Sequence, residues 1–169
     1  MNFHLKRLFY NGIENYNTMN ANTQNLIAGA IGAVALNAVH GLAKKIIKDA
    51  PKIDEIGNEG LSKAIESVGL ASPSEQVVDN TTTTFNFVTN TLSYRMIGEY
   101  DSKNLVLLGA LHGLAVGAST LSLSKTLDLD ETPVARTLLT ECLTVTWYIL
   151  GGIATATALK VIRSHTDKM

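Results

Sequence analysis

Three long apolar segments dominate the pattern of hydrophobic and polar positions along this chain. They cover residues 25–43, 104–123 and 142–159, and none contains an aspartate, glutamate, lysine or arginine. Each has 18–20 residues, close to the roughly 20 that an α-helix needs to cross the hydrocarbon of a bilayer. None has the polar side that a surface helix of a soluble protein requires. The pattern predicts three membrane-spanning helices. The alternative, fully buried helices of a soluble domain, leaves little of the 169-residue chain to cover them.

A fourth segment, residues 77–98, is more polar. One face of the expected helix carries apolar side chains such as Phe85 and Leu92, whereas the opposite face carries Asn86 and Asn90. Such a helix crosses a membrane only if neighbouring helices shield its polar face, and otherwise it lies at the interface. We favour a shielded fourth span.

The remaining sequence divides into connectors and ends. Residues 54–68 predict a short amphipathic helix, and residues 125–136, with a proline and several carboxylates, predict a solvated loop. The expected organisation is a polar extension at 1–23, a single bundle domain at 24–163 and a tail at 164–169. The fold class is therefore all-α: a polytopic membrane bundle of three to four transmembrane helices.

Small residues recur on the apolar segments. Gly109, Gly113 and Gly117 stand at strict four-residue spacing, which aligns them in one stripe of a helix. Residues of the same kind in the other two segments are Gly29, Gly32, Ala33, Gly151 and Gly152. Helices in a membrane associate through close packing rather than a hydrophobic driving force, so all eight are predicted helix-packing positions. The pattern leaves open whether the partner helix belongs to the same chain or to another copy.

Two of these segments also share a short similar sequence. Residues 38–43 (AVHGLA) match residues 110–115 (ALHGLA) at an offset of 72 residues. The same offset aligns residues 77–98 with the final apolar segment. We therefore hypothesise a two-fold internal repeat of parallel helix pairs.

Polar residues at membrane depth are the candidates for function. They are Asn37, His40, His112, Glu141 and Tyr148. Two interpretations stay open: hydrogen bonds between helices, or a polar site for a ligand or proton. No metal-ligand spacing, nucleophile elbow, phosphate loop or dinucleotide fingerprint is present, so we expect no catalytic residue, metal or cofactor.

Charge and composition limit the classes of partner that this chain is expected to bind. The net charge is −1, which argues against nucleic-acid binding. Lys44, Lys45 and Lys48 directly follow the first apolar segment and are predicted to meet anionic lipid headgroups. Lys160, Arg163 and Lys168 form a second basic cluster at the end of the last apolar segment. Three spans let both clusters face the cytoplasm, whereas four spans place them on opposite sides, so the orientation stays open. The mean hydropathy of +0.14 is modest because the polar start and middle dilute the apolar segments.

Three stretches carry a resemblance: residues 26–57 (LIAGAIGAVALNAVHGLAKKIIKDAPKIDEIG), 107–117 (LLGALHGLAVG) and 132–152 (TPVARTLLTECLTVTWYILGG). Together, over roughly residues 24–160, the chain resembles a group of small bacterial integral membrane proteins without assigned function. The resemblance implies a multi-pass protein of the bacterial inner (cytoplasmic) membrane and carries no mechanism.

The expected function is non-enzymatic. The chain would pack through its glycine-rich faces in the lipid bilayer, as a self-associating protein or as an accessory subunit of a larger membrane complex. The alternative is a small transporter or channel with a polar site near Asn37, His40 and His112.

Overall fold

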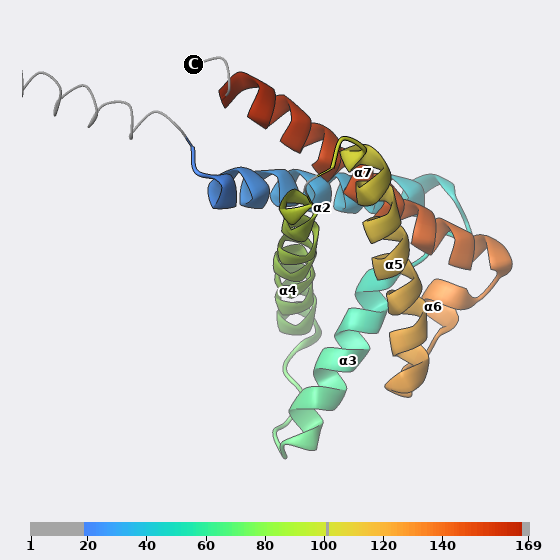
Figure 1. Ribbon diagram of the computed structural model, residues 1–169. Helices are drawn as coiled ribbons and strands as arrows, with labels where there is room; N and C mark the ends of the chain where they lie inside the picture. Colours follow the sequence, from blue (N-terminus) through green and yellow to red (C-terminus); the bar gives the residue numbers. More distant parts are fainter. Residues whose placement is uncertain (1–18, 101, 167–169) are drawn as a thin grey trace, which may run out of the picture.

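The computed structural model describes residues 19–100 and 102–166, which form helices and their connections (Figure 1). In chain order the elements are α2 (Ala21–Ile46), α3 (Ile53–Ser67), α4 (Glu75–Arg95), the 3-10 helix η1 (Met96–Glu99), α5 (Leu105–Thr126), α6 (Thr132–Ala135) and α7 (Leu138–Thr166). No strand occurs in the described ranges. The predicted all-α class is confirmed. Residues 1–18 of the predicted extension and residues 167–169 of the tail lie outside the description.

Three helices are long and apolar enough to cross a membrane: α2, α5 and α7. They cover residues 25–43, 105–123 and 142–159 of the predicted segments, so three apolar helices of membrane length are confirmed. Helix α4 has 21 residues, enough to cross, but its threonines and asparagines make it too polar to count among them. Helix α2 begins at Ala21 because the Asn20 side chain accepts a hydrogen bond from the Thr23 N–H, at 2.9 Å.

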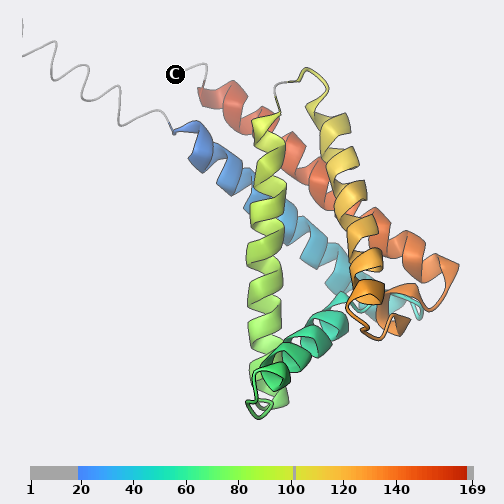
Figure 2. The ribbon, with the colours of Figure 1, turned by 60° about the horizontal axis from the view of Figure 1, so that its bottom comes forward.

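The long helices pack in the spatial order α4, α2, α7, α5. Helices α2 and α7 run side by side in opposite directions at the centre, with α4 against α2 and α5 against α7 (Figures 1 and 2). The two outer helices, α4 and α5, barely touch. They spread apart toward α3, which lies across the gap (Figure 2).

Both connectors lie at the same end of the bundle, which we call the connector end (residues 47–74 and 127–137). The Lys52 N–H donates to the Pro133 carbonyl at 2.8 Å. The Asp130 N–H donates to a Glu59 carboxylate oxygen at 2.8 Å. The structure therefore joins the loop after α2 to the loop after α5.

The opposite end, the terminal end, holds the start of α2, η1 and the end of α7. There the Arg163 guanidinium donates to the Gly98 carbonyl at 2.7 Å and to the Asn25 side-chain oxygen at 3.2 Å. The Asn25 amide in turn donates to Glu99 at 3.1 Å. Because α4 starts beside α3 and ends at η1, it runs the height of the bundle from the connector end to the terminal end.

The predicted glycine stripe of α5 faces α7 of the same chain. Gly109, Gly113 and Gly117 are buried. A Cβ added at Gly113 would stand 2.7 Å from the Ile149 Cα, and one at Gly117 would stand 2.9 Å from the Val145 Cα. Carbon atoms in contact are normally about 3.5–4.0 Å apart. Only glycine allows the two backbones to approach this closely.

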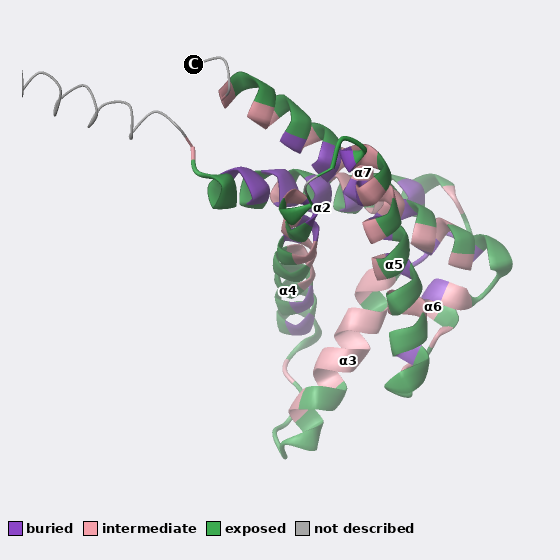
Figure 3. Cartoon of the chain, in the orientation of Figure 1, coloured by how far each residue is buried: buried purple, intermediate pink, exposed green. Residues whose placement is uncertain are grey.

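The other predicted packing positions also lie between helices of this chain. A Cβ at Gly29 would meet the Arg95 backbone nitrogen of α4 at 2.8 Å, and one at Gly32 would collide with Thr155 of α7. Gly151 faces the Tyr94 ring, and Gly152 faces Gly109. Ala33 is fully buried. Buried residues accordingly gather where the long helices meet, whereas α3 has none (Figure 3).

Candidate functional site

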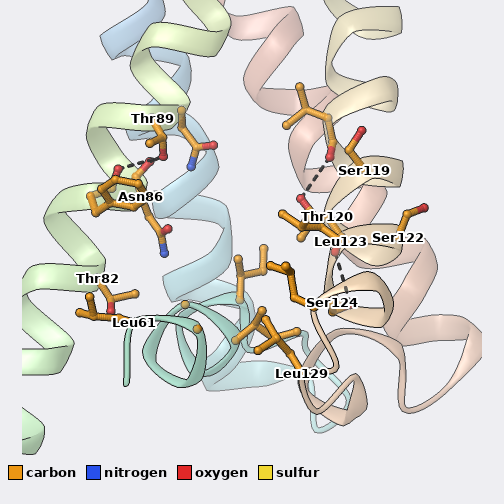
Figure 4. A pocket seen from close by; sticks show the side chains of 18 of the residues that line it. Leu61, Thr82, Asn86, Thr89, Ser119, Thr120, Ser122, Leu123, Ser124 and Leu129 are labelled. Atoms are coloured by element: carbon orange, nitrogen blue, oxygen red, sulfur yellow. Dashed lines mark hydrogen bonds between the residues drawn. The ribbon is translucent and has the colours of Figure 1, made fainter. Parts of the chain in front are cut away.

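A cavity of about 940 Å³ lies between α4 and α5 and is bounded at the connector end by α3 (Figure 4). We call it the chamber. Helix α4 contributes Thr82, Asn86 and Thr89 to one wall, and α5 contributes the opposite wall from residues 116–126. Tyr148 of α7 also lines it. The divergence of α4 from α5 creates the space, and α3 limits it.

Side-chain contacts close the chamber at the terminal end. The Ser93 hydroxyl of α4 and the His112 Nε2 of α5 are 3.1 Å apart, within hydrogen-bond distance. The Tyr100 hydroxyl lies 3.4 Å from the other ring nitrogen of His112. This contact joins the two walls where α4 and α5 come nearest.

Helix α3 closes the connector end. It is held to α4 by a hydrogen bond from Asn58 to Asp79. It is held to the loop after α5 by the Lys63 ammonium, which donates to the Asp128 carbonyl. The side between α4 and α5 stays open, since the lining residues Ala118 and Ser122 are exposed. The chamber is thus shut along the bundle axis and open laterally.

The hydroxyl groups on the α5 wall already donate their hydrogens within the helix. Ser119, Thr120, Ser122 and Thr126 each donate to the carbonyl four residues earlier, at 2.8–3.1 Å. This bonding satisfies the hydroxyl hydrogen and leaves oxygen lone pairs as acceptors. The α5 wall is therefore mildly polar and offers acceptors rather than donors.

The α4 wall carries the groups that can both donate and accept. Asn86 and Asn90 are half-buried and stand one helical turn apart. Neither carboxamide has a hydrogen-bond partner within the described part of the chain. Thr82, one turn before Asn86, has a buried hydroxyl that likewise lacks a partner among the described residues. No charged side chain is among the residues that line the chamber.

The histidine of the first apolar segment belongs to a different cluster. The His40 Nε2 lies 3.2 Å from one carboxylate oxygen of Asp54, and the Lys44 ammonium lies 2.7 Å from the other. The His40 hydrogen bond and the Lys44 contacts hold the pKa of Asp54 well below its ordinary value, although partial burial opposes the shift. The His40 ring packs edge-on against Trp147 at 5.3 Å. This cluster anchors the start of α3 to the end of α2.

The structure does not assemble the five predicted polar residues into one site. His40 and His112 share no hydrogen-bond or ring partner among the described residues. Asn37 is exposed on α2, and Glu141 is half-buried near the start of α7. Tyr148 is buried, lines the chamber and accepts a hydrogen bond at its carbonyl from the Tyr94 hydroxyl, at 2.9 Å.

The predicted headgroup lysines lie at the connector end. Lys44 is paired with Asp54, whereas Lys45 and Lys48 are exposed. Among the described residues, no group of three or more His, Cys, Asp or Glu side chains is placed to hold a metal ion.

Sequence reasoning found the polar face of α4 but missed the chamber. The available signal was the run of hydroxyl residues in the second half of α5, residues 119–126. These residues share a wall opposite Asn86 and Asn90 only because α4 and α5 diverge. That divergence is set by how each helix packs on the central pair.

The fold and the chamber define a class: an all-α protein with three helices suited to crossing a membrane and a cavity between its outer helices. In comparisons with protein-family models, curated proteins and solved structures, the chain matches none of them.

Proposed function

We propose that this chain is a non-enzymatic, multi-pass membrane protein with four spans, whose role is to hold a ligand in the chamber. The chamber is the observation that carries the role, because it is large enough for a small molecule and opens sideways between two helices. The resemblance noted above supports a place in the bacterial inner membrane. No cofactor or catalytic group enters the proposal.

Two features support α4 as the fourth span. The connectors after α2 and after α5 are hydrogen-bonded to each other, so an even number of crossings must separate them. Val88 and Leu92 of α4 are exposed and do not line the chamber, as suits side chains that face lipid, whereas the α4 amides of Asn86 and Asn90 line the chamber. The polar face of α4 thus borders the chamber, while apolar side chains of the same helix point outward.

The proposal still includes association with a second copy or with other membrane proteins, but not through the glycine stripes. The glycine stripes of α5 and α7 are occupied within the chain, so a second copy or a larger complex would use other outward surfaces. The transporter alternative receives less support, because Asn37, His40 and His112 lie apart and the chamber is closed along the bundle axis.

The internal repeat remains a hypothesis. A repeat relates α2 to α5 and α4 to α7. Helix α2 packs extensively on α7, but the corresponding pair, α5 and α4, barely touches. Within each proposed half the two helices do pack on each other, α2 on α4 and α5 on α7, so only the contacts between the halves are asymmetric.

The side of the membrane on which each connector lies tests the proposal of four spans. Reporter domains fused after Lys52 and after Asp128 are expected on the same side of the membrane, because α4 and α5 both cross between them. A paired reporter that is active on only one side, such as alkaline phosphatase against a fluorescent protein, makes the measurement. Opposite sides would show that α4 does not cross and would remove the fourth span.

A bulky side chain placed in the chamber tests the proposed role in ligand binding. Ala118 lines the chamber and is exposed, whereas Ala115, on the same helix, is exposed and does not line it. Lipid extract of the host membrane is expected to raise the thermal midpoint of the detergent-solubilised protein, because a ligand that binds only the folded state stabilises it. Ala118→Trp should lose this shift and Ala115→Trp should keep it. Equal shifts in both variants would contradict ligand binding in the chamber.

A further inference from the structure

On the basis of the proposed function, we propose the chemical class of the ligand. The geometry points to an uncharged amphiphile whose head both donates and accepts hydrogen bonds to Asn86 and Asn90, and whose hydrocarbon body lies against α3. It enters from the bilayer between α4 and α5. An unbranched fatty amide is the simplest molecule of this class.

The absence of charge on the walls selects an uncharged head. A charged group taken from water into a site without a counter-charge pays a large desolvation cost. The lining residues include no aspartate, glutamate, lysine, arginine or histidine. Charged side chains of α3, such as Asp54 and Lys63, are instead paired outside the chamber, with Lys44 and Glu59 respectively.

Hydrogen-bond capacity selects a head that donates as well as accepts. The α5 hydroxyls have used their hydrogens on their own helix, so they present acceptors that would repel a carboxylate or phosphate. The carboxamides of Asn86 and Asn90 supply both donors and acceptors. A primary amide matches them with two N–H groups and one carbonyl.

Apolar side chains at the connector end select a hydrocarbon body. Ile56 and Leu61 of α3 face the chamber together with Leu123 and Leu129. None of the α3 side chains is buried, so its apolar face is only partly covered by the protein. A hydrocarbon chain would cover it and remove this apolar surface from contact with water, which favours binding.

The closed ends favour a small molecule over a partner helix. A membrane-spanning helix would have to pass both the Ser93–His112 contact and α3, which shut the chamber at either end. A compact ligand needs only the lateral opening. The volume of about 940 Å³ lies at the upper end of typical ligand pockets, roughly 300–1,000 Å³.

Two probes of equal length separate the head-group classes. Radiolabelled oleamide and oleate are titrated against the full chain in phosphatidylcholine nanodiscs, at alkaline pH so that the carboxylate is ionised. Oleamide is expected to bind saturably and at least about tenfold more tightly than oleate. Ala118→Trp should abolish oleamide binding, and Ala115→Trp should preserve it.

The asparagines are tested by a matched pair of variants. The double variant Asn86→Leu/Asn90→Leu is expected to bind oleamide about tenfold more weakly, as the loss of two hydrogen bonds implies. Asn80→Leu, on the same helix but outside the lining, should bind like the parent. Circular dichroism and thermal melting confirm that each variant is folded.

The outcomes distinguish the two proposals. Equal binding of oleamide and oleate, both lost in Ala118→Trp, would keep the chamber as a ligand site and overturn the class. The same follows if the double asparagine variant binds oleamide like the parent. Neither probe binding would also overturn the class, and the lipid-extract thermal shift of Ala118→Trp against Ala115→Trp then decides the ligand-binding role. An Ala118→Trp variant that changes only the oligomeric mass would overturn the proposed function itself, because a second copy would then occupy the chamber.

Discussion

Gly113→Leu is expected to prevent the native packing of α5 on α7 and to leave little folded protein after purification. The position is buried, and an added Cβ would stand 2.7 Å from both the Ile149 Cα and the Tyr148 carbonyl carbon. The obstacle is the backbone of a long helix, which cannot rotate aside as a side chain can. The cost should exceed the roughly 1–3 kcal/mol usual for an overpacked core. Thermal unfolding in detergent measures it.

Gly41→Leu supplies the control for helix propensity and added hydrophobic bulk. Gly41 is also helical, but no heavy atom lies within 4 Å of the position its Cβ would take. That substitution should be neutral or slightly stabilising, since leucine favours a helix by about 1 kcal/mol over glycine. If Gly113→Leu melts like Gly41→Leu, the close approach of α5 and α7 is wrong. If it is folded as a monomer and loses only an oligomer, the stripe faces another copy.

Arg163→Met is expected to be the next most damaging change, by about 1–3 kcal/mol, because it leaves buried acceptors unpaired. Its guanidinium is bonded to the Gly98 carbonyl and to Asn25, which is only 3% exposed. Methionine keeps the apolar length of the side chain and removes only the donors. The variant should lower the thermal midpoint in detergent and loosen the junction of α2, η1 and α7.

Lys160→Met is the matched control for Arg163→Met. Lys160 is exposed on the same helix, so its loss should leave stability nearly unchanged. Hydrogen exchange of the backbone amides around η1 provides a second readout, with faster exchange expected only for Arg163→Met. Equal stability of the two variants would mean that the network at the terminal end contributes nothing to the fold.

The long apolar helices could be predicted from sequence because their signal is local. A run of about 20 residues without charge is sufficient to identify a helix of membrane length, and α2, α5 and α7 all contain such runs. The spacing of Gly109, Gly113 and Gly117 likewise indicated a face for close packing. Helix periodicity alone places these three residues in one stripe, whatever the helix then meets.

The partners of those faces could not be predicted, because they depend on which helices meet. His40 and His112 occupy matching places in the echoed motif, yet one contacts Asp54 of α3 and the other contacts Ser93 of α4. The local sequence around each histidine is nearly the same. The difference arises from the helices that surround each one, which no short-range pattern encodes.

By itself, the sequence determined that this protein is helical, which three segments are long and apolar enough to cross a membrane, and which residues form flat faces on them. Only the tertiary structure decided that the α5 stripe meets α7 of the same chain, that both connectors share one end, and that α4 and α5 diverge to leave the chamber. The physical reason is that the two kinds of information extend over different distances along the chain. Periodicity and hydropathy are properties of one continuous segment of about 20 residues, whereas the chamber exists because two outer helices pack on different members of a central pair.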